Sequence, residues 1–225
     1  MLMSEILRSN SQARAFTPAL APVEEVASEA MHFTLALVAL IFVAPLMLLV
    51  ALAIFSHDRG PIVFAHRRIG RGGQSFPCLK FRSMAVDAEA RLAEVLACDP
   101  DARAEWEKDH KLRNDPRVTK LGAFLRRTSL DELPQLFNVL AGDMSLVGPR
   151  PIVDAEIQKY GRRFRQYCAV KPGITGLWQV SGRNDTSYRA RVALDCIYAK
   201  RRTVALDLAI MFNTVPAVLL RRGSY

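Results

Sequence analysis

The longest apolar stretch of the chain runs from residue 33 to residue 55 and reads FTLALVALIFVAPLMLLVALAIF. Thr34 is its only polar residue, and no charge interrupts it. As a helix rising about 1.5 Å per residue it would reach roughly 34 Å, enough to cross the core of a bilayer. Because the stretch is apolar on every side, the pattern favours a membrane segment over a buried globular helix. A secretory signal peptide fits poorly, since the stretch starts late, follows acidic residues and is too long for a signal core.

The pattern does not decide how this segment lies in the membrane. Four arginines follow it within a short distance, which predicts that its C-terminal side is cytoplasmic. Pro45 lies at its middle, where proline removes one helical hydrogen bond and clashes with the preceding turn. The residues alone therefore leave two arrangements open: a kinked helix that spans the membrane, and a re-entrant helix that returns to the side it entered.

The remaining pattern predicts mostly short elements. Residues 1–29, rich in Ser, Ala and Pro, indicate a flexible tail. Residues 62–69 and 74–83 flank Gly70, Gly72 and Gly73 and predict a β-hairpin. The expected helices are a solvated charged one within 85–113, a short amphipathic one over 118–127, and an apolar one over 206–220. The last of these is expected to pack on the core or to lie in the membrane interface.

Composition narrows the class of protein. The 225 residues are 50% hydrophobic and 24% charged, which is too apolar for a disordered chain and too charged for a polytopic membrane protein. The four cysteines form no CxxC pair, which argues against a disulfide scaffold or a zinc ribbon. The net charge of +9 suits an anionic partner: nucleic acid, anionic lipid or a phosphorylated substrate. We expect no nucleic-acid partner, since the sequence contains no zinc module, helix-turn-helix spacing or RNA-binding aromatic motif.

The first segment with candidate catalytic residues is 125–140, LRRTSLDELPQLFNVL. Ser129 and Glu132 have the spacing of a capping box, and that structural reading accounts for the segment by itself. A functional reading is also open. Arg126 lies just upstream, where its charge would help to keep Asp131 ionised. The adjacent carboxylates of Asp131 and Glu132 could share a divalent cation, because hard oxygen ligands suit Mg²⁺.

Two further segments carry cations on a constrained backbone. In GDMSLVGPRP (142–151), prolines flank Arg150 and would hold its guanidinium in a fixed position for bidentate phosphate recognition. In KPGITGLWQVSGR (171–183), three glycines allow close backbone approach to a ligand, and Lys171 and Arg183 bracket the segment. No Walker A or Rossmann glycine pattern is present.

Taken together, KFRSM (80–84), SLDELPQL (129–136), GDMSLVGPRP (142–151) and KPGITGLWQVSGRN (171–184) resemble the bacterial sugar transferases, the small monotopic phosphoglycosyl transferases. The resemblance runs from about residue 33 to the end of the chain. The charged insert near 87–113 and the closing RRGSY look most like members that start exopolysaccharide synthesis on undecaprenyl phosphate, the galactose enzymes especially.

The resemblance implies a reaction and a set of residues. A sugar-1-phosphate would pass from a UDP-hexose to undecaprenyl phosphate with release of UMP, through a phosphosugar-aspartyl intermediate on Asp131. Glu132 would assist and help to hold Mg²⁺. Four basic residues would face the phosphates: Lys80, Arg126, Arg150 and Arg183. A non-catalytic scaffold on the same fold would require a missing catalytic residue, and none is missing. The motifs do not distinguish galactose from glucose.

The resemblance also implies an α-rich α+β fold. Residues 30–56 would form a re-entrant membrane helix broken at Ala44-Pro45, and residues 57–225 a cytoplasmic catalytic domain on the bacterial inner membrane, with a homodimer as one possible assembly. Ala44 stands where the family usually has a serine. The stretch Ser28–His32 lacks the basic pair that usually precedes the helix, so the usual cationic anchor at the N-terminal end is missing.

Overall fold

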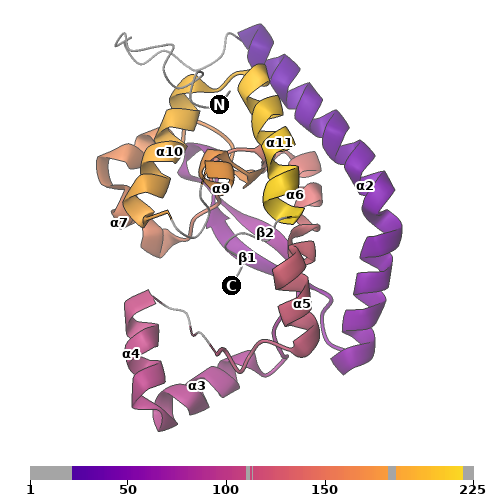
Figure 1. Ribbon diagram of the computed structural model, residues 1–225, viewed down its shortest axis with the longest axis vertical. Helices are drawn as coiled ribbons and strands as arrows, with labels where there is room; N and C mark the ends of the chain where they lie inside the picture. The colour runs from indigo at the N-terminus through magenta and orange to yellow at the C-terminus, as the bar shows by residue number, and fades with distance from the viewer. Residues whose placement is uncertain (1–21, 110–111, 113, 182–185, 220–225) are drawn as a thin grey trace.

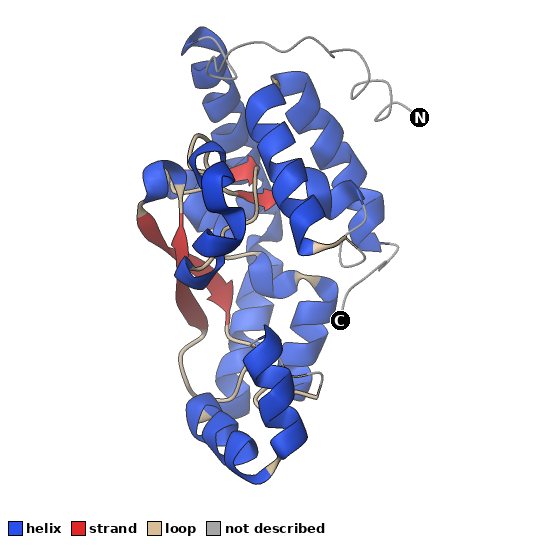
Figure 2. Ribbon diagram, turned by 90° about the vertical axis from the view of Figure 1, so that its left-hand side faces the viewer, coloured by secondary structure: helices blue, strands red, loops and turns tan. Residues whose placement is uncertain are grey.

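The computed structural model describes residues 22–109, 112, 114–181 and 186–219. Helices make up most of the described chain, and the strands form two small two-stranded sheets between them (Figure 2). The long helix α2 (Pro22–Asp58) runs along one side of the molecule (Figure 1). These features confirm the predicted helix-rich class with a small β-hairpin.

The course of α2 differs from the prediction in two ways. It begins at Pro22, so residues 22–29 are helical rather than part of a tail, and proline followed by acidic residues suits a first helical turn. The helix also continues through Ala44 and Pro45, where a break is predicted, and curves along its length instead (Figure 1). The physical reason is packing, because Ala36 and Met47 on either side of the proline are both buried against the same domain.

A buried polar network ties the beginning of α2 to the domain. The His32 imidazole lies 3.0 Å from the Asp207 carboxylate, and the Ser28 hydroxyl donates to the same carboxylate at 3.4 Å. Arg202 donates to Ser28 at 2.9 Å, and the Tyr198 hydroxyl lies 2.7 Å from the second Asp207 oxygen. All five side chains are buried. Polar groups buried in this way stabilise one docking position, because any shift would leave them unpartnered.

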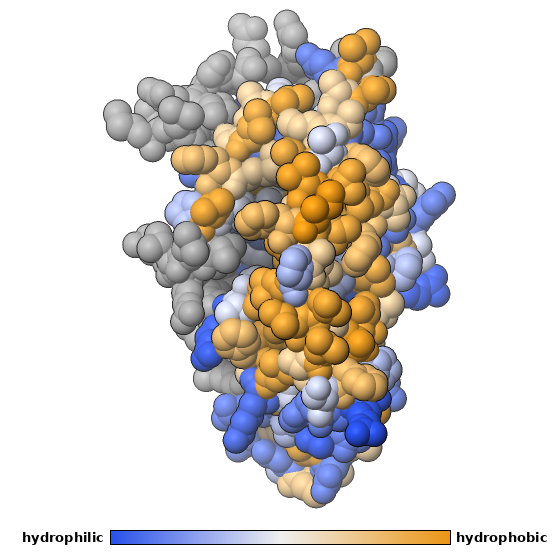
Figure 3. Space-filling view, turned by 90° about the vertical axis from the view of Figure 1, so that its right-hand side faces the viewer, coloured by the Kyte–Doolittle hydropathy of each residue, from blue (hydrophilic) through white to orange (hydrophobic). Residues whose placement is uncertain are grey.

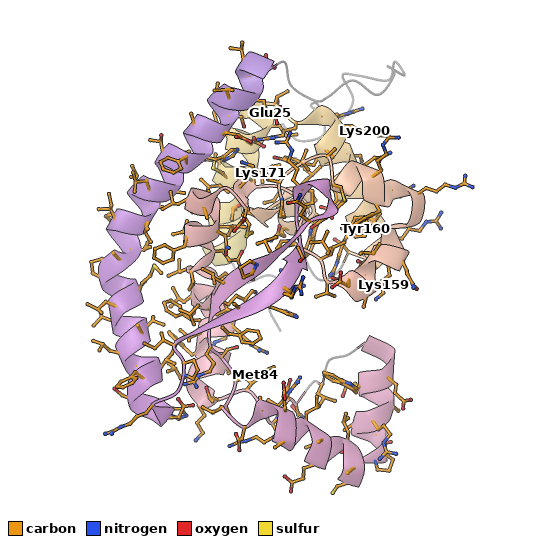
Figure 4. All side chains as sticks on the ribbon, turned by 180° about the vertical axis from the view of Figure 1, so that it is seen from behind. Glu25, Met84, Lys159, Tyr160, Lys171 and Lys200 are labelled. Atoms are coloured by element: carbon orange, nitrogen blue, oxygen red, sulfur yellow. The ribbon has the colours of Figure 1, made fainter. Side chains whose placement is uncertain are left out.

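Exposed ion pairs add to this attachment. Glu29 lies 3.0 Å from Lys171 and 3.5 Å from Arg71, which also pairs with Glu25 at 2.7 Å. Figure 4 shows Glu25 and Lys171 at the end of the domain where α2 begins. The N-terminal end of α2 is therefore anchored through acidic side chains, in place of the cationic anchor that the sequence lacks. At the other end, Asp58 pairs with Arg82.

The predicted hairpin is confirmed. Strands β1 (Val63–Ile69) and β2 (Ser75–Phe81) pair antiparallel through the 3₁₀ turn η1 (Arg71–Gly73). Gly72 and Gly73 have φ values of 71° and 79°, a left-handed conformation that glycine adopts without steric cost. The hairpin therefore turns where the glycine cluster predicts.

The charged segment that follows forms two helices, where one is predicted. These are α3 (Ala88–Cys98) and α4 (Pro100–Asp109), which project from the body (Figure 1). Pro100 disfavours a helical conformation at Asp99, whose carboxylate then accepts hydrogen bonds from the first backbone N–H groups of α4. The predicted amphipathic helix follows as α5 (Lys120–Thr128).

The C-terminal half brings two motifs together. Strands β3 (Ser145–Val147) and β4 (Gly173–Thr175) pair in parallel, so the GDMSLVGPRP and KPGITG segments lie side by side. Gly148 permits this approach, because a Cβ there would lie 2.4 Å from the Lys171 carbonyl oxygen. The other elements are η2 (Leu130–Glu132), α6 (Gln135–Ala141), η3 (Asp154–Glu156), α7 (Ile157–Tyr160), η4 (Gly161–Arg163), α8 (Phe164–Tyr167), α9 (Leu177–Ser181), α10 (Tyr188–Arg201) and α11 (Val204–Leu219).

Helix α11 packs one apolar face on the core, as predicted, and leaves a second apolar face exposed. Leu206 and Ile210 are buried in a core cluster with Val147 and Tyr198, so one face packs on the core. Phe212, which is 79% exposed, lies on the other face with Leu208 and Val215.

The outer side of α2 is exposed and apolar. Its large exposed side chains include Phe33, Val38, Ile41, Phe42, Leu48, Leu49, Leu52 and Phe55. Figure 3 shows this side of the molecule largely covered by hydrophobic residues. Among the described helices, α2 is the one long and apolar enough to cross a membrane. A continuous apolar surface of this kind marks a contact with lipid or protein.

Candidate active site

The two candidate carboxylates follow a sharp turn after α5. Ser129 has φ 58° and ψ 15°, a left-handed conformation that is uncommon for a residue other than glycine. It ends α5 and directs the chain into η2, which carries Asp131 and Glu132. The Ser129 side chain caps no backbone N–H, so the capping-box interpretation is wrong. The carboxylates are therefore presented by the left-handed C-cap of α5, not by a side-chain cap at the start of η2.

The hairpin is fastened beside these carboxylates by Asn138 of α6. Its side-chain oxygen accepts from the Leu79 backbone at 2.9 Å, and its amide donates to the Pro77 carbonyl at 2.8 Å. This edge contact fixes β2 against α6. It brings the Lys80 ammonium to 2.6 Å from the Glu132 carboxylate, across 52 positions of sequence.

Arg150 approaches the same carboxylate from the β3–β4 side, with a guanidinium nitrogen 4.0 Å from Glu132 Oε1. Lys80, Glu132 and Arg150 line one pocket, so three of the sequence motifs converge there. Asp131 is buried and is not among the residues that line the pocket. The pocket is also lined by Arg68, Cys78, Gln135, Pro151, Gly173 and Ile174. Three cations around one carboxylate leave this pocket with a positive excess, which suits an anionic ligand.

The electrostatics of the two acids differ. Burial raises the pKa of Asp131, and the charge of Glu132 adds to the rise, while Lys80, Arg126 and Arg150 oppose it. Burial also acts to raise the pKa of Glu132, but Lys80 and Arg150 outweigh it, so the pKa of Glu132 is lowered. The site therefore holds one ionised acid bound to a lysine and one buried acid whose charge depends on the surrounding cations.

The other predicted site residues are placed differently. Arg126 does not line the pocket; its guanidinium donates to Ser83 at 2.8 Å, and it acts on Asp131 through charge. Lys171 pairs with Glu29 at the start of α2. Arg183 lies outside the described residues. Arg68 lines the pocket but belongs to none of the sequence motifs; its even spacing from His66 and Phe64 along β1 is the signal that indicates a shared face.

Comparison with known families decides the class of this site. The sequence model of a family described as bacterial sugar transferase matches residues 23–221. The chain belongs to this family. The undecaprenyl-phosphate galactose phosphotransferase of Salmonella typhimurium is 56% identical over 186 residues, covering 83% of this chain and 39% of the relative. The exopolysaccharide production protein ExoY of Rhizobium meliloti is 48% identical over 209 residues, covering 93% and 92% of the two chains.

A third relative acts on a different sugar. The UDP-glucose:undecaprenyl-phosphate glucose-1-phosphate transferase of Klebsiella pneumoniae is 38% identical over 198 residues, covering 83% of this chain and 38% of the relative. The chain thus spans about two fifths of the length of the Salmonella and Klebsiella proteins.

Asp131 and Glu132 are the acids at this site that could hold a magnesium ion together with substrate phosphates. Within the described residues no group of three or more His, Cys, Asp and Glu side chains gathers as a complete metal site. Mg²⁺ commonly binds through one or two carboxylates together with substrate phosphates. Asp131 and Glu132 can supply that number of carboxylates, although Lys80 already occupies one Glu132 oxygen.

Proposed function

We propose that this sugar transferase passes a hexose-1-phosphate from a UDP-hexose to undecaprenyl phosphate and releases UMP, as the first membrane step of exopolysaccharide synthesis. The observation that carries the proposal is a pocket where Glu132 meets the cations Lys80, Arg68 and Arg150. Asp131 is buried next to Glu132 and feels the charges of Lys80 and Arg150. The names of the relatives support the substrate classes. Galactose is the favoured sugar, since the galactose relative is 56% identical and the glucose relative 38%.

The proposed chemistry is a double displacement at phosphorus. A carboxylate oxygen of Asp131 attacks the phosphorus that bears the hexose, and the bond from that phosphorus to the UMP oxygen breaks. A phosphate oxygen of the lipid then attacks the same phosphorus and releases Asp131. A covalent step of this kind lets one pocket serve a water-soluble donor and a lipid acceptor in turn.

The basic residues supply charge neutralisation, which phosphoryl transfer needs more than other catalytic groups. Lys80 and Arg150 hold Glu132 ionised beside the reacting phosphates, and Arg68 extends the positive wall. Arg126 helps to keep Asp131 ionised against its burial, which a nucleophile requires. Magnesium bound by Asp131 and Glu132 would offset the charge of the diphosphate.

The membrane arrangement that we propose keeps both ends of α2 on the cytoplasmic side of the inner membrane. Its support is that the first turns of α2 and its last residue are attached to one domain, through Asp207 and Arg82 respectively. A spanning helix would have to break one of these attachments. Labelling of a Ser11→Cys variant, otherwise free of cysteine, by a membrane-impermeant reagent in intact cells would contradict the proposal.

The test of the reaction is covalent labelling. Purified protein is incubated with Mg²⁺ and a UDP-hexose labelled in the hexose phosphate, without any lipid acceptor. We expect label on the wild-type protein, chased off by undecaprenyl phosphate, and none on Asp131→Asn. Glu132→Gln should label weakly. Equal labelling or undiminished UMP release in Asp131→Asn would remove Asp131 as the nucleophile.

A further inference from the structure

The face of the hairpin that carries Lys80 extends beyond the residues that line the pocket. In the β1–β2 register, Phe64 lies opposite Lys80 and His66 lies opposite Cys78. Directly opposed residues of an antiparallel pair place their side chains on the same face. Since Lys80 and Cys78 line the pocket, the register places Phe64 and His66 next to its lining, on the same face of the hairpin.

This row consists of two adjacent rings at the rim of a charged site. Phe64 is 55% exposed, so its ring is open to contact with a ligand. The Phe64 and His66 ring centroids are 5.9 Å apart. Partial burial and the charges of Arg68 and Lys80 lower the pKa of His66, which favours the neutral imidazole. That form can both donate and accept a hydrogen bond.

The orientation of the UDP-hexose in the pocket decides which part of it lies beside Phe64 and His66. This step rests on the proposed function. The diphosphate must reach from Asp131, where the hexose-bearing phosphorus reacts, towards cations that neutralise the leaving UMP. Arg68 lies four positions beyond Phe64 on β1, which is about 13 Å along the strand. With the leaving phosphate at the Arg68 end, the hexose lies at the Lys80 end, beside Phe64.

We infer that Phe64 and His66 form the hexose subsite of the donor, with the C–H face of the sugar packed on the Phe64 ring and a sugar hydroxyl bound by the His66 imidazole. Galactose and glucose differ in the orientation of one hydroxyl, which alters the C–H face that an aromatic ring meets. A hydrogen bond to a specific hydroxyl gives the larger discrimination, because the wrong isomer leaves a polar group unpartnered.

The experiment measures kcat/KM for UDP-galactose and UDP-glucose, together with inhibition by UMP, in Phe64→Ala and His66→Gln. We expect Phe64→Ala to lower kcat/KM for the preferred sugar about tenfold and His66→Gln to reduce the preference between the sugars about three- to tenfold. The inhibition constant of UMP should stay within about twofold of wild type, because UMP lacks the hexose. Both residues are exposed, so thermal unfolding should be unchanged.

Matched controls lie on the opposite face of the same strand. Val63→Ala and Arg67→Gln remove comparable exposed side chains that point away from the pocket. They should leave unchanged both kcat/KM for the preferred sugar and the preference between the two sugars. Weaker inhibition by UMP in parallel with the loss of kcat/KM would place uracil on Phe64 and overturn the hexose subsite. A rise confined to the KM of undecaprenyl phosphate would place the lipid there instead. Unaltered kinetics in Phe64→Ala and His66→Gln would also overturn the hexose subsite. Wild-type protein that is inactive on every UDP-hexose would instead overturn the proposed function.

Discussion

Replacing Asp207 with alanine tests how firmly the start of α2 is held by the domain. Asp207 is fully buried, and its carboxylate lies within 3.7 Å of polar atoms of four other side chains: Ser28, His32, Tyr198 and Arg202. Its removal leaves the Arg202 guanidinium, 5% exposed, without its buried counter-charge. Breaking a buried pair of this kind costs about 3–5 kcal/mol. For a domain of this size each kcal/mol corresponds to roughly 2–4 °C, so the expected fall in Tm is about 6–20 °C.

The assay is thermal unfolding of detergent-solubilised protein. Asp101→Ala removes an exposed carboxylate on α4 and should change Tm by little, since surface substitutions usually stay within about 0.5 kcal/mol. A double variant, Asp207→Leu with Arg202→Leu, removes both charges. Its loss of stability should be smaller than the summed losses of Asp207→Leu alone and Arg202→Leu alone. If Asp207→Ala unfolds within about 2 °C of wild type, the buried network does not hold α2 in the way described.

Three further outcomes follow from the site. In Lys80→Met the pKa of Asp131 and of Glu132 should rise, because the ammonium that lowers both is gone; the acid limb of the pH profile of UMP release should therefore move to higher pH, and an unmoved limb would argue against the contact. Arg150→Ala should reduce kcat/KM about 10–150-fold through loss of a charge-assisted hydrogen bond to phosphate, with no change in Tm; unchanged kinetics would leave Arg150 as part of a rigid turn only. Gly148→Ala should destabilise the fold by about 1–3 kcal/mol in denaturant titrations, because its methyl group would meet the Lys171 carbonyl; undiminished stability would show that β3 and β4 can separate at this point.

The local pattern of apolar, polar and glycine residues was enough to predict several elements of this protein. The apolar run, the glycine cluster at residues 70–73 and the amphipathic repeat over 118–127 each correspond to an element at the predicted place. In each case the interactions that form the element lie within it, so hydrophobic period and turn chemistry are sufficient signals. The motif residues Asp131, Glu132, Lys80 and Arg150 could likewise be selected from the sequence as candidates.

Tertiary structure decided how these candidates meet and which neighbours complete the site. Arg68 reaches the pocket because Asn138 fastens the hairpin edge to α6, and no periodicity encodes a contact across 59 positions of sequence. Ser129 resembles an N-cap in sequence, yet in the structure it is the left-handed C-cap that ends α5. The course of α2 through Pro45 shows the same physics. The local preference for a break is worth about 3 kcal/mol, and burial of the helix on both sides of the proline, with its first turns held at Asp207, outweighs it.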